Sequence, residues 1–409
     1  MGFTIEQACP QCGGPIELDE TDHLLSCPFC GVRNYIFAPN YFRYALPHKA
    51  PNKKIIYAPF LRFKGNVFFC KDMTVGYRVV DLAHVGLQLK GLPVSLGLRP
   101  QAMKMKFVTR ETEGAFLKFT LKASEIVDRA GRLSSGRLSN QVLHRAYIGE
   151  TMSVIYLPLY TERDMLFDAI LNRPITKLAN GDEVFEPFIH KNPNWDLTFM
   201  STLCPQCGWN LEGDRDSVIM ICANCDTAWE VRQGAFNRIQ YKVVHGQNPA
   251  AVYLPFWKTS AKSQGGVEIN SFADFIRITN QPRVLGKKWD NEPMHYWSPA
   301  FKIRPKVFLN LSRQFTISQK TYKAEERIKG KHLYSVTLPR TEAAQAMKVI
   351  LASSTLTKNR VYPYLPQIRF EVGLSELIFL PFTEKGHEMI QEDMDISINK
   401  NTLEFGRSL

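Results

Sequence analysis

Eight cysteines in four Cys-x-x-Cys pairs constrain this chain more than any other feature of its sequence. They fall into two sets, Cys9, Cys12, Cys27 and Cys30, and Cys204, Cys207, Cys222 and Cys225. Each cysteine of the second set lies 195 positions after its counterpart, as 204 lies after 9, and 14 residues separate the inner cysteines of either set. Two such pairs at this spacing close a tetrahedral site of four sulfurs, which suits zinc. Since protein fills all four positions, we expect two structural zinc ions with no open site for chemistry.

The residue that follows each pair supports four metal-binding knuckles. In a zinc knuckle the chain turns tightly after the second cysteine, and backbone N–H groups there can donate to the sulfurs. A positive φ is often needed at this turn, which favours glycine. Gly13, Gly31 and Gly208 occupy three of these places. Asp226 occupies the fourth, and aspartate is among the few other residues that tolerate this conformation.

These segments resemble the zinc-ribbon superfamily, which includes ribbons of transcription factors, ribosomal proteins and helicases. The resemblance covers about 22 residues in each half and implies that each set of four cysteines is one ligand set. The wider layout, in which a ribbon precedes the segments 57–65 and 96–104, resembles uncharacterised bacterial proteins with zinc ribbons. Such proteins are sometimes labelled after replication-restart helicases, but this chain has no GxxxxGK[ST] phosphate loop and cannot be such a motor. The resemblance implies no activity.

Cysteine usage and the first residues point to a reducing compartment. Disulfides are the alternative for paired cysteines, but the first residues contain neither the basic region nor the apolar stretch of a secretion signal. No stretch approaches the roughly 18 apolar residues of a membrane span. We therefore expect a cytoplasmic protein. The ninth cysteine, Cys70, follows Val67, Phe68 and Phe69 and is expected to be a buried small hydrophobic residue.

Charge is distributed unevenly along the chain. The formal net charge is +12, and two zinc ions with four thiolates each would lower it to about +8. The segments 9–30 and 204–225 contain seven acidic residues and one basic residue, Arg215. The metal modules are therefore acidic, and the basic surplus lies in the rest of the chain.

The common offset of 195 residues indicates an internal duplication. The segment 55–61 matches 251–257, and the proline-interrupted run 154–162 matches 377–384. A third match aligns Pro100 with Pro299. The predicted fold is a β-rich α+β tandem duplication, in which each half is a four-cysteine zinc ribbon followed by a mainly antiparallel β unit with a few helices. The predicted domains are 1–38 (zinc ribbon 1), 39–192 (β-rich α+β domain 1), 193–234 (zinc ribbon 2) and 235–409 (β-rich α+β domain 2).

Local patterns refine this outline. Residues 54–70 read as strands with a turn at 64–66, and 151–160 and 369–382 also read as strands. Prolines inside these runs lack the N–H of a ladder, so we expect them at edges or bulges. Helices are expected over 125–132, capped by Ser124, and over 342–352, capped by Thr341. The second half is longer, and its charged stretch 320–331 predicts a solvated insertion.

The first functional hypothesis is a non-catalytic scaffold or adaptor that acts through an unidentified protein partner. Metal binding contributes about 10–16 kcal/mol to order in small zinc domains, so two ribbons could fix a large bipartite surface. In a variant of this hypothesis the basic surface contacts an acidic partner or an anionic membrane surface. No polybasic run or amphipathic basic helix supports the membrane version.

The second hypothesis is nucleic-acid binding, which a sequence pI near 9.2 permits. The acidic ribbons would repel phosphates, so the contacts would come from the β-rich domains. The candidate residues are Arg43, Lys53, Lys54, Arg62 and Lys64, with Phe42, Tyr44, Phe60 and Phe63 as stacking surfaces. A second candidate set is Arg129, Arg132, Arg137 and Arg145.

The third hypothesis is an enzyme whose site is not visible in the sequence. The chain contains no HExxH, GxSxG, dinucleotide GxGxxG or kinase signature. Its nine histidines are scattered, and none is paired at ligand spacing. We therefore expect no catalytic residues, although a site assembled only in three dimensions would leave no such trace.

Overall fold

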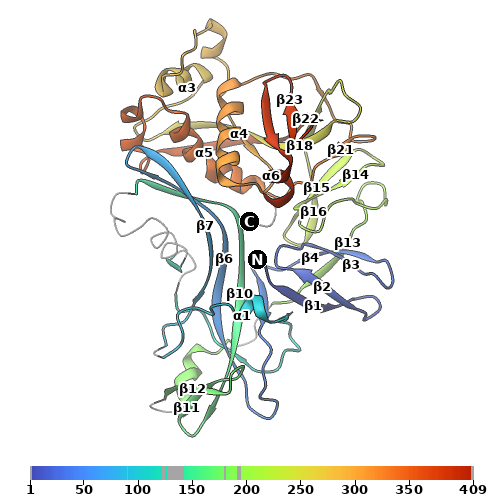
Figure 1. The fold of residues 1–409 in the computed structure, drawn as a ribbon, viewed down its shortest axis with the longest axis vertical. Helices are drawn as coiled ribbons and strands as arrows, with labels where there is room; N and C mark the ends of the chain where they lie inside the picture. Colours follow the sequence, from blue (N-terminus) through green and yellow to red (C-terminus); the bar gives the residue numbers. More distant parts are fainter. Residues whose placement is uncertain are drawn as a thin grey trace.

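The structure is a computed structural model in which two β-rich units and two small cysteine modules form one elongated molecule (Figure 1). It describes residues 2–89, 91–121, 125–126, 142–178, 181–190 and 195–406. The C-terminal unit lies at one end, the strands β11 and β12 lie at the other, and the cysteine modules lie along one side (Figure 1). No helix within the described residues has the length and apolar character required to cross a membrane.

Each cysteine module is built from short strands. The first comprises β1 (Thr4–Ala8), β2 (Pro15–Asp19), β3 (Leu24–Ser26) and β4 (Arg33–Phe37). The second comprises β13 (Thr198–Ser201), β14 (Ile219–Cys222), β15 (Thr227–Arg232) and β16 (Ala235–Ile239). In each module an antiparallel hairpin, β3–β4 or β14–β15, carries the second pair of cysteines at its turn.

The N-terminal unit is organised around two long antiparallel strands, β6 and β10. Its elements are β5 (Phe42–Ala45), β6 (Ile56–Lys71), β7 (Thr74–Val85), α1 (Arg99–Ala102), β8 (Met105–Phe107), β9 (Ala115–Phe116), β10 (His144–Glu162), β11 (Met165–Asp168), β12 (Arg173–Lys177) and the 3-10 helix η2 (Gly181–Phe188). Strand β10 pairs with β6 and β11 in antiparallel fashion and with β5 in parallel. Strand β8 pairs with β1, which joins the first cysteine module to this sheet.

The C-terminal unit has the same plan and adds helices. Its strands are β17 (Tyr241–Val244), β18 (Val252–Gln264), β19 (His295–Pro299), β20 (Ala324–Glu325), β21 (His332–Leu333), β22 (Arg369–Lys385), β23 (Glu388–Gln391) and β24 (Ile396–Asn399). Its helices are α3 (Phe272–Thr279), α4 (Pro305–Ser318), α5 (Arg340–Ser354) and α6 (Lys400–Phe405), with 3-10 turns η3 (Lys287–Asp290), η4 (Lys358–Arg360) and η5 (Tyr362–Tyr364). A capping box between Ser271 and Asp274 starts α3.

Strand register confirms the duplicated layout. In the modules, Ser26 lies opposite Arg33 and Ile221 lies opposite Ala228, so the pairing repeats with the same offset as the cysteines. In the units, β22 is the counterpart of β10. Strand β22 pairs with β18, with β17 in parallel and with β23, just as β10 pairs with β6, with β5 in parallel and with β11. The β-rich α+β tandem fold is therefore observed, with similar four-cysteine sites in both halves.

The third landmark of the duplication is wrong. Phe60 pairs with Val85 and its counterpart Phe256 pairs with Pro299, so Pro299 corresponds to Val85 and not to Pro100. The local resemblance misled because it rests on a proline followed within four residues by a lysine, Lys104 or Lys302, and so short a pattern recurs at unrelated positions.

Four prolines occupy the long strands, and the expectation that they mark edges or bulges needs correction. Pro59, Pro158, Pro255 and Pro381 all lie in strands that have neighbours on both sides. At each proline, however, the partner on one side of the strand changes, because one neighbouring strand ends there and another begins. For Pro59, β9 pairs with β6 up to Tyr57 and β7 pairs with it from Phe60. The missing N–H therefore interrupts no ladder.

The turn expected at residues 64–66 is absent, because β6 runs without a break from Ile56 to Lys71. Gly65 is instead explained by a close approach of two backbones. A β-bulge in β10 between Ile148 and Thr151 lies opposite it, and a Cβ on Gly65 would be 2.8 Å from the Cα of Glu150. Glycine in a strand next to a bulge is a common solution to such crowding.

The predicted helix over 342–352 is confirmed as α5, but it begins after Pro339 with no side-chain cap, so Thr341 is not its cap. The helix expected over 125–132 falls almost entirely outside the described residues. The stretch 320–331 is only partly the solvated insertion that we expected. Ile328 within it is 3% exposed and packs in an apolar cluster with residues of the second module.

The largest apolar core contains residues of both units. Phe68, Cys70 and Ile148 of the N-terminal sheet share it with the buried faces of α4 and α5. Cys70 is fully buried, as expected, and burial raises its pKa to about 12. The bent ends of β6, β7 and β10 therefore dock on the helices of the other unit (Figure 1). The four predicted domain boundaries remain predictions.

Candidate metal centres and the junction between the units

The two predicted cysteine sets form two compact groups of sulfur atoms. Within each group the four Sγ atoms all lie within 4.8 Å of one another. Cys9 and Cys30 are 3.7 Å apart at Sγ, and Cys12 and Cys27 are 3.6 Å apart. In the second group, the corresponding Sγ distances are 3.6 Å for Cys204–Cys225 and 3.5 Å for Cys207–Cys222.

These distances fit four ligands around one metal ion. A disulfide would bring two sulfurs to about 2.05 Å, so the pairs are not cross-linked. Four sulfurs at about 2.3 Å from a central ion would be about 3.8 Å apart along a tetrahedral edge. Each group could therefore hold one metal ion, and its four protein donors would complete a tetrahedral shell.

The knuckle geometry follows the sequence prediction. Gly13, Gly31 and Gly208 have φ values of +72°, +71° and +73°, and the N–H of each donates to the carbonyl of the first cysteine in its pair. Asp226 also has a positive φ, of +51°. All four turns therefore use the left-handed backbone region, which favours glycine and tolerates aspartate.

Asp226 has a role that the sequence alone did not reveal. Its carboxylate Oδ1 accepts hydrogen bonds from the backbone N–H groups of Ile328 at 2.7 Å and Lys329 at 3.0 Å. Its carbonyl accepts the hydroxyl proton of Tyr241 at 2.8 Å. The fourth knuckle therefore holds the 320–331 segment against the second module, which a glycine could not do.

The two modules pack on each other. Strand β13, which precedes the second set of cysteines, pairs with β4 of the first module. The carbonyl of Arg215 accepts hydrogen bonds from the N–H groups of His23 and Leu24, and its guanidinium pairs with Asp22 at 3.3 Å. An apolar cluster that contains Leu24, Tyr35, Cys204, Leu211, Met220, Cys222 and Trp229 fills the space between them. The two four-cysteine groups therefore lie in one continuous structure.

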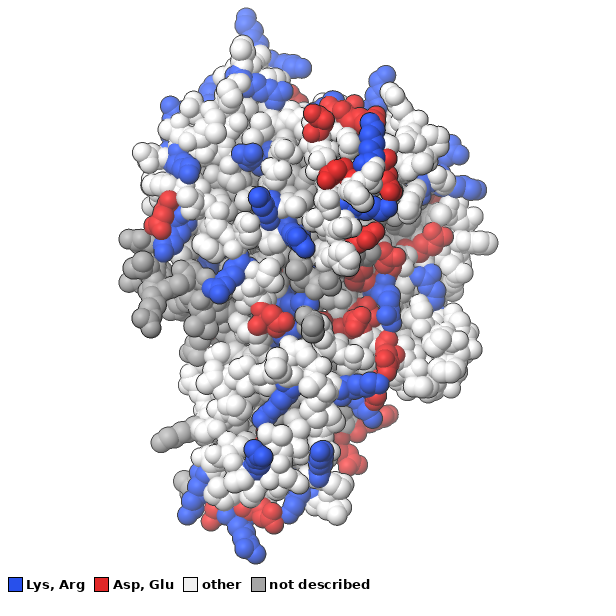
Figure 2. Space-filling view, in the orientation of Figure 1, with Lys and Arg blue, Asp and Glu red and all other residues white. Residues whose placement is uncertain are grey.

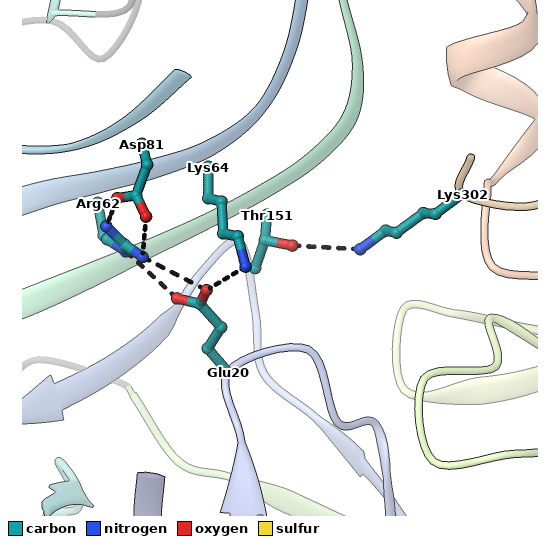
Figure 3. A network of polar contacts seen from close by, with 6 residues as sticks. All are labelled: Glu20, Arg62, Lys64, Asp81, Thr151 and Lys302. Atoms are coloured by element: carbon teal, nitrogen blue, oxygen red, sulfur yellow. Dashed lines mark hydrogen bonds and ion pairs between the residues drawn. The ribbon is translucent and has the colours of Figure 1, made fainter. Parts of the chain in front are cut away.

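A buried charge network attaches the first module to the N-terminal sheet (Figure 3). Glu20 follows β2, and its side chain is 1% exposed. It accepts from Arg62 Nε at 3.2 Å and pairs with Lys64 Nζ at 3.3 Å. Arg62 also pairs with Asp81 of β7. Buried charges are tolerated only when they are paired in this way, so the network fixes the module on β6.

Two side chains of the C-terminal unit form hydrogen bonds with the bulge of β10. Lys302 donates from Nζ to Thr151 Oγ1 at 3.3 Å, and it reaches across from the opposite unit (Figure 3). The carboxylate of Glu342 in α5 accepts the backbone N–H of Gly149. Gly149 has a φ of +71°, which the bulge requires. The irregular backbone of β10 therefore adds a polar contact between the units to the apolar docking of β6, β7 and β10 on α4 and α5.

A cavity of about 310 Å³ lies where both modules and both units meet. Its acidic lining residues are Glu20, Glu150, Asp216, Glu230 and Glu342, and its basic one is Lys302. Burial raises the pKa of Glu342 to about 8, and burial lowers the pKa of Lys302 despite the nearby carboxylates. Burial also lowers the pKa of His23, another lining residue, to about 4, so this imidazole is neutral near pH 7. The cavity is a polar joint in which carboxyl groups outnumber cations.

The residues predicted to bind nucleic acid do not form one exposed patch. Arg62 and Lys64 are buried at 2% and 6% exposure in the Glu20 network. Arg43 is half-buried and stacks on Trp195, with 4.9 Å from its guanidinium to the ring centroid. Lys53 pairs with Glu162 at 3.2 Å, and Lys54 is exposed. The placement of Arg62 and Lys64 on a contact surface therefore needs correction, because both lie in the interior.

The proposed stacking surfaces are also interior. Tyr44, Phe60 and Phe63 are 1% exposed or less, and Phe42 is half-buried. Arg145 lies in β10, whereas the rest of the second candidate set lies outside the described residues. Nucleic-acid binding through other basic residues stays a prediction.

No protein-family model, no curated protein and no solved structure matches the chain. The site must therefore be interpreted from its own residues. Sequence patterns located the eight cysteines, but Glu20, Lys302 and Glu342 carried no local signal. Their partners lie 42 to 193 positions away, and only the fold brings them together.

Proposed function

We propose that this chain is a non-catalytic, zinc-stabilised scaffold or adaptor that acts through contacts with a protein partner. The observation that carries this proposal is the arrangement of the two four-cysteine groups. They lie in modules that pack on each other, and the modules meet both β-rich units at one joint. Metal bound there would hold two surfaces in a fixed relation.

Zinc is the metal that the donor set favours. Thiolate ligands select soft or borderline metals, and a tetrahedral set of four sulfurs is typical of zinc or of iron–sulfur centres. The two knuckle pairs in each module are typical of structural zinc sites, as in the zinc-ribbon superfamily that the segments resemble. Four thiolates leave no coordination position for water or substrate, so the role of the metal is structural.

The chemistry of the site also favours a reducing compartment such as the cytoplasm. Eight thiols must stay reduced to bind two ions, and disulfides would compete with metal in an oxidising environment. Nucleic-acid binding is the competing function. Two of its five candidate residues, Arg62 and Lys64, are used in buried ion pairs, which weakens this alternative.

The test is isolation of the affinity-tagged full-length chain from its own cells in buffer without chelator. We expect a stoichiometric protein partner that stays bound after nuclease treatment. The matched variant Cys222→Ser should release this partner, because it removes one ligand of the second metal group. Recovery of nuclease-sensitive nucleic acid without any protein partner would contradict the proposal and support the competing function.

A further inference from the structure

A hollow lies between the two units, away from both four-cysteine groups. It has a volume of about 690 Å³. The tip of β7 in the N-terminal unit forms one wall, and α4, α5, β24 and α6 of the C-terminal unit form the others. Any molecule bound there would contact both halves of the duplication. The relative position of the halves therefore determines the shape of this site.

The described residues that line the hollow include three basic side chains and no acidic one. Lys306 and Arg313 project from α4, and Lys358 lies in η4. All three are exposed, and none forms an ion pair with any residue that the structure describes. Figure 2 shows Lys and Arg side chains over α4 with uncharged surface between them. The rim is therefore opposite in sign to the carboxylate-rich cavity at the junction.

The floor of the hollow is apolar. Leu311, Tyr362 and Ile398 are buried at its base. Val307 on α4 is partly exposed, and Tyr77 on the tip of β7 is 43% exposed. A concave apolar site of this size with a few charged groups at its rim is typical of a binding site. Unpaired cations around an apolar floor select a ligand that carries both negative charge and an apolar group.

We propose that this hollow binds an acidic segment of a protein partner, with an aliphatic or aromatic side chain of that segment inserted among Leu311, Tyr362 and Ile398. The proposal rests on the proposed adaptor function and names the site and the partner chemistry. Carboxylates of the segment pair with Lys306, Arg313 and Lys358, and the apolar anchor contributes most of the affinity. Anchors in desolvated pockets dominate the free energy of most interfaces, while charges at the rim mainly set specificity and association rate.

A protein segment fits this site better than a nucleic acid. Single strands bind along extended basic grooves where several exposed aromatic rings stack with successive bases. Among the described lining residues, Tyr77 is the one aromatic ring that is clearly exposed, and the floor is largely aliphatic. Three cations also offer few phosphate contacts, whereas one short acidic segment uses all three.

The test uses the zinc-loaded full-length chain and a phage library of random 16-residue peptides. After selection on the immobilised protein, enriched peptides are synthesised with a fluorescent label, and their dissociation constants are measured by anisotropy. We expect enriched peptides with net negative charge and at least one large apolar residue. Their affinity should fall when salt is raised, because the rim charges are exposed.

Charge reversal locates the site. The double variant Arg313→Glu with Lys358→Glu should weaken peptide binding at least ten-fold, and its melting temperature should match that of the wild type because both side chains are exposed and form no ion pair with a described residue. The matched control is Arg173→Glu, an exposed arginine in β12 at the opposite end of the molecule, which should leave affinity unchanged. Leu311→Ala removes an apolar contact from the floor of the hollow. It should therefore lower peptide affinity without changing the rim charges, and it serves as a second probe.

Three results would overturn the assignment. The first is that the selection enriches neutral or basic peptides, or enriches no peptide at all. The second is that the wild type and the double variant bind the enriched peptides with equal affinity. The third is that a labelled 20-nucleotide single strand of DNA displaces the peptide from the wild type and fails to bind the double variant. If the double variant still retains the native protein partner, the adaptor function stands and this site is wrong. If the wild type itself retains no protein partner, the proposed function fails.

Discussion

The two cysteine modules share strand register and cage geometry and both pack on an apolar core, but they differ in the polar contacts that attach them to the molecule. The first packs its apolar side chains on the N-terminal sheet, pairs β1 with β8, and adds the buried charges of Glu20, Arg62 and Lys64. The second is held by apolar packing, in which Ile219 joins the β17–β22 core, and by the clamp from Asp226 to the 320–331 segment. A repeated metal cage therefore does not require a repeated environment.

The strand that completes the three-stranded sheet beside each hairpin also differs between the modules. In the second module, β16 follows β15 directly and pairs with it. In the first module that place beside β4 is taken by β13, which comes from the other half of the chain. The first module thus depends on the second for its sheet, and the second is complete by itself. Loss of the second module should therefore harm both.

The largest predicted effect comes from removing one cysteine ligand from either module. Cys27→Ser and Cys222→Ser each remove one sulfur from a closed cage, and we expect bound zinc to fall from two ions per chain to one. Structural zinc contributes about 10–16 kcal/mol in isolated zinc-finger peptides, so the affected module should unfold locally. Elemental analysis with hydrogen exchange measures both. Cys222→Ser should also deprotect β4, because β13 is lost.

The control for this experiment is Cys70→Ala. Cys70 is buried in the apolar core and lies outside both cages. It should retain two zinc ions with a modest loss of stability. Retention of two ions by either cage variant would refute the assignment of the ligands.

The next effect tests the charged attachment of the first module. Glu20→Gln removes the buried carboxylate that Arg62 and Lys64 share, although Arg62 keeps its pair with Asp81, and loss of one member of a buried ion pair typically costs about 3–5 kcal/mol. Chemical denaturation should show this loss in the free energy of unfolding. Glu17→Gln is the matched control, because Glu17 is exposed and its pair with Lys104 should contribute about 0–1 kcal/mol. Similar losses for both variants would rule out the special role of Glu20.

A smaller effect is expected at the fourth knuckle. Asp226→Gly suits the positive φ but removes the acceptor for the N–H groups of Ile328 and Lys329, so we expect a loss of about 1–3 kcal/mol. Asp226→Asn keeps an acceptor oxygen and should lose less. Hydrogen exchange of the 326–331 segment provides the readout. Equal protection in the wild type and in Asp226→Gly would disprove the clamp.

The smallest effect at neutral pH concerns Glu342. An acid whose pKa rises on folding, here from 4.5 to about 8, binds more protons in the folded state than in the unfolded state. Its contribution to stability is therefore greatest at low pH and falls as pH rises through about 8. Glu342→Gln keeps an acceptor for Gly149 and lacks this titration. Between pH 6 and pH 9 the wild type should lose stability relative to this variant, and a constant difference would contradict the account.

The parts of the structure that sequence could predict are those specified locally. Cysteine spacing and the residue after each pair indicated both cages and even the positive φ of Asp226. Alternation and composition located most long strands. The turn expected at residues 64–66 was wrong, because Gly65 is required by the backbone of β10, a strand distant from it in the sequence. The strand β13 beside β4 and the grip of Lys302 on Thr151 likewise depend on distant pairing, which no local pattern reveals.

The most direct test of the account is the metal content of the natively purified chain, measured by elemental analysis on the same sample whose thermal unfolding is recorded. We predict two zinc ions per chain, and we predict that a strong chelator removes them only together with the cooperative unfolding transition. A chain that keeps its wild-type melting temperature with no metal bound would contradict the claim that two closed cages of four sulfurs hold this structure together.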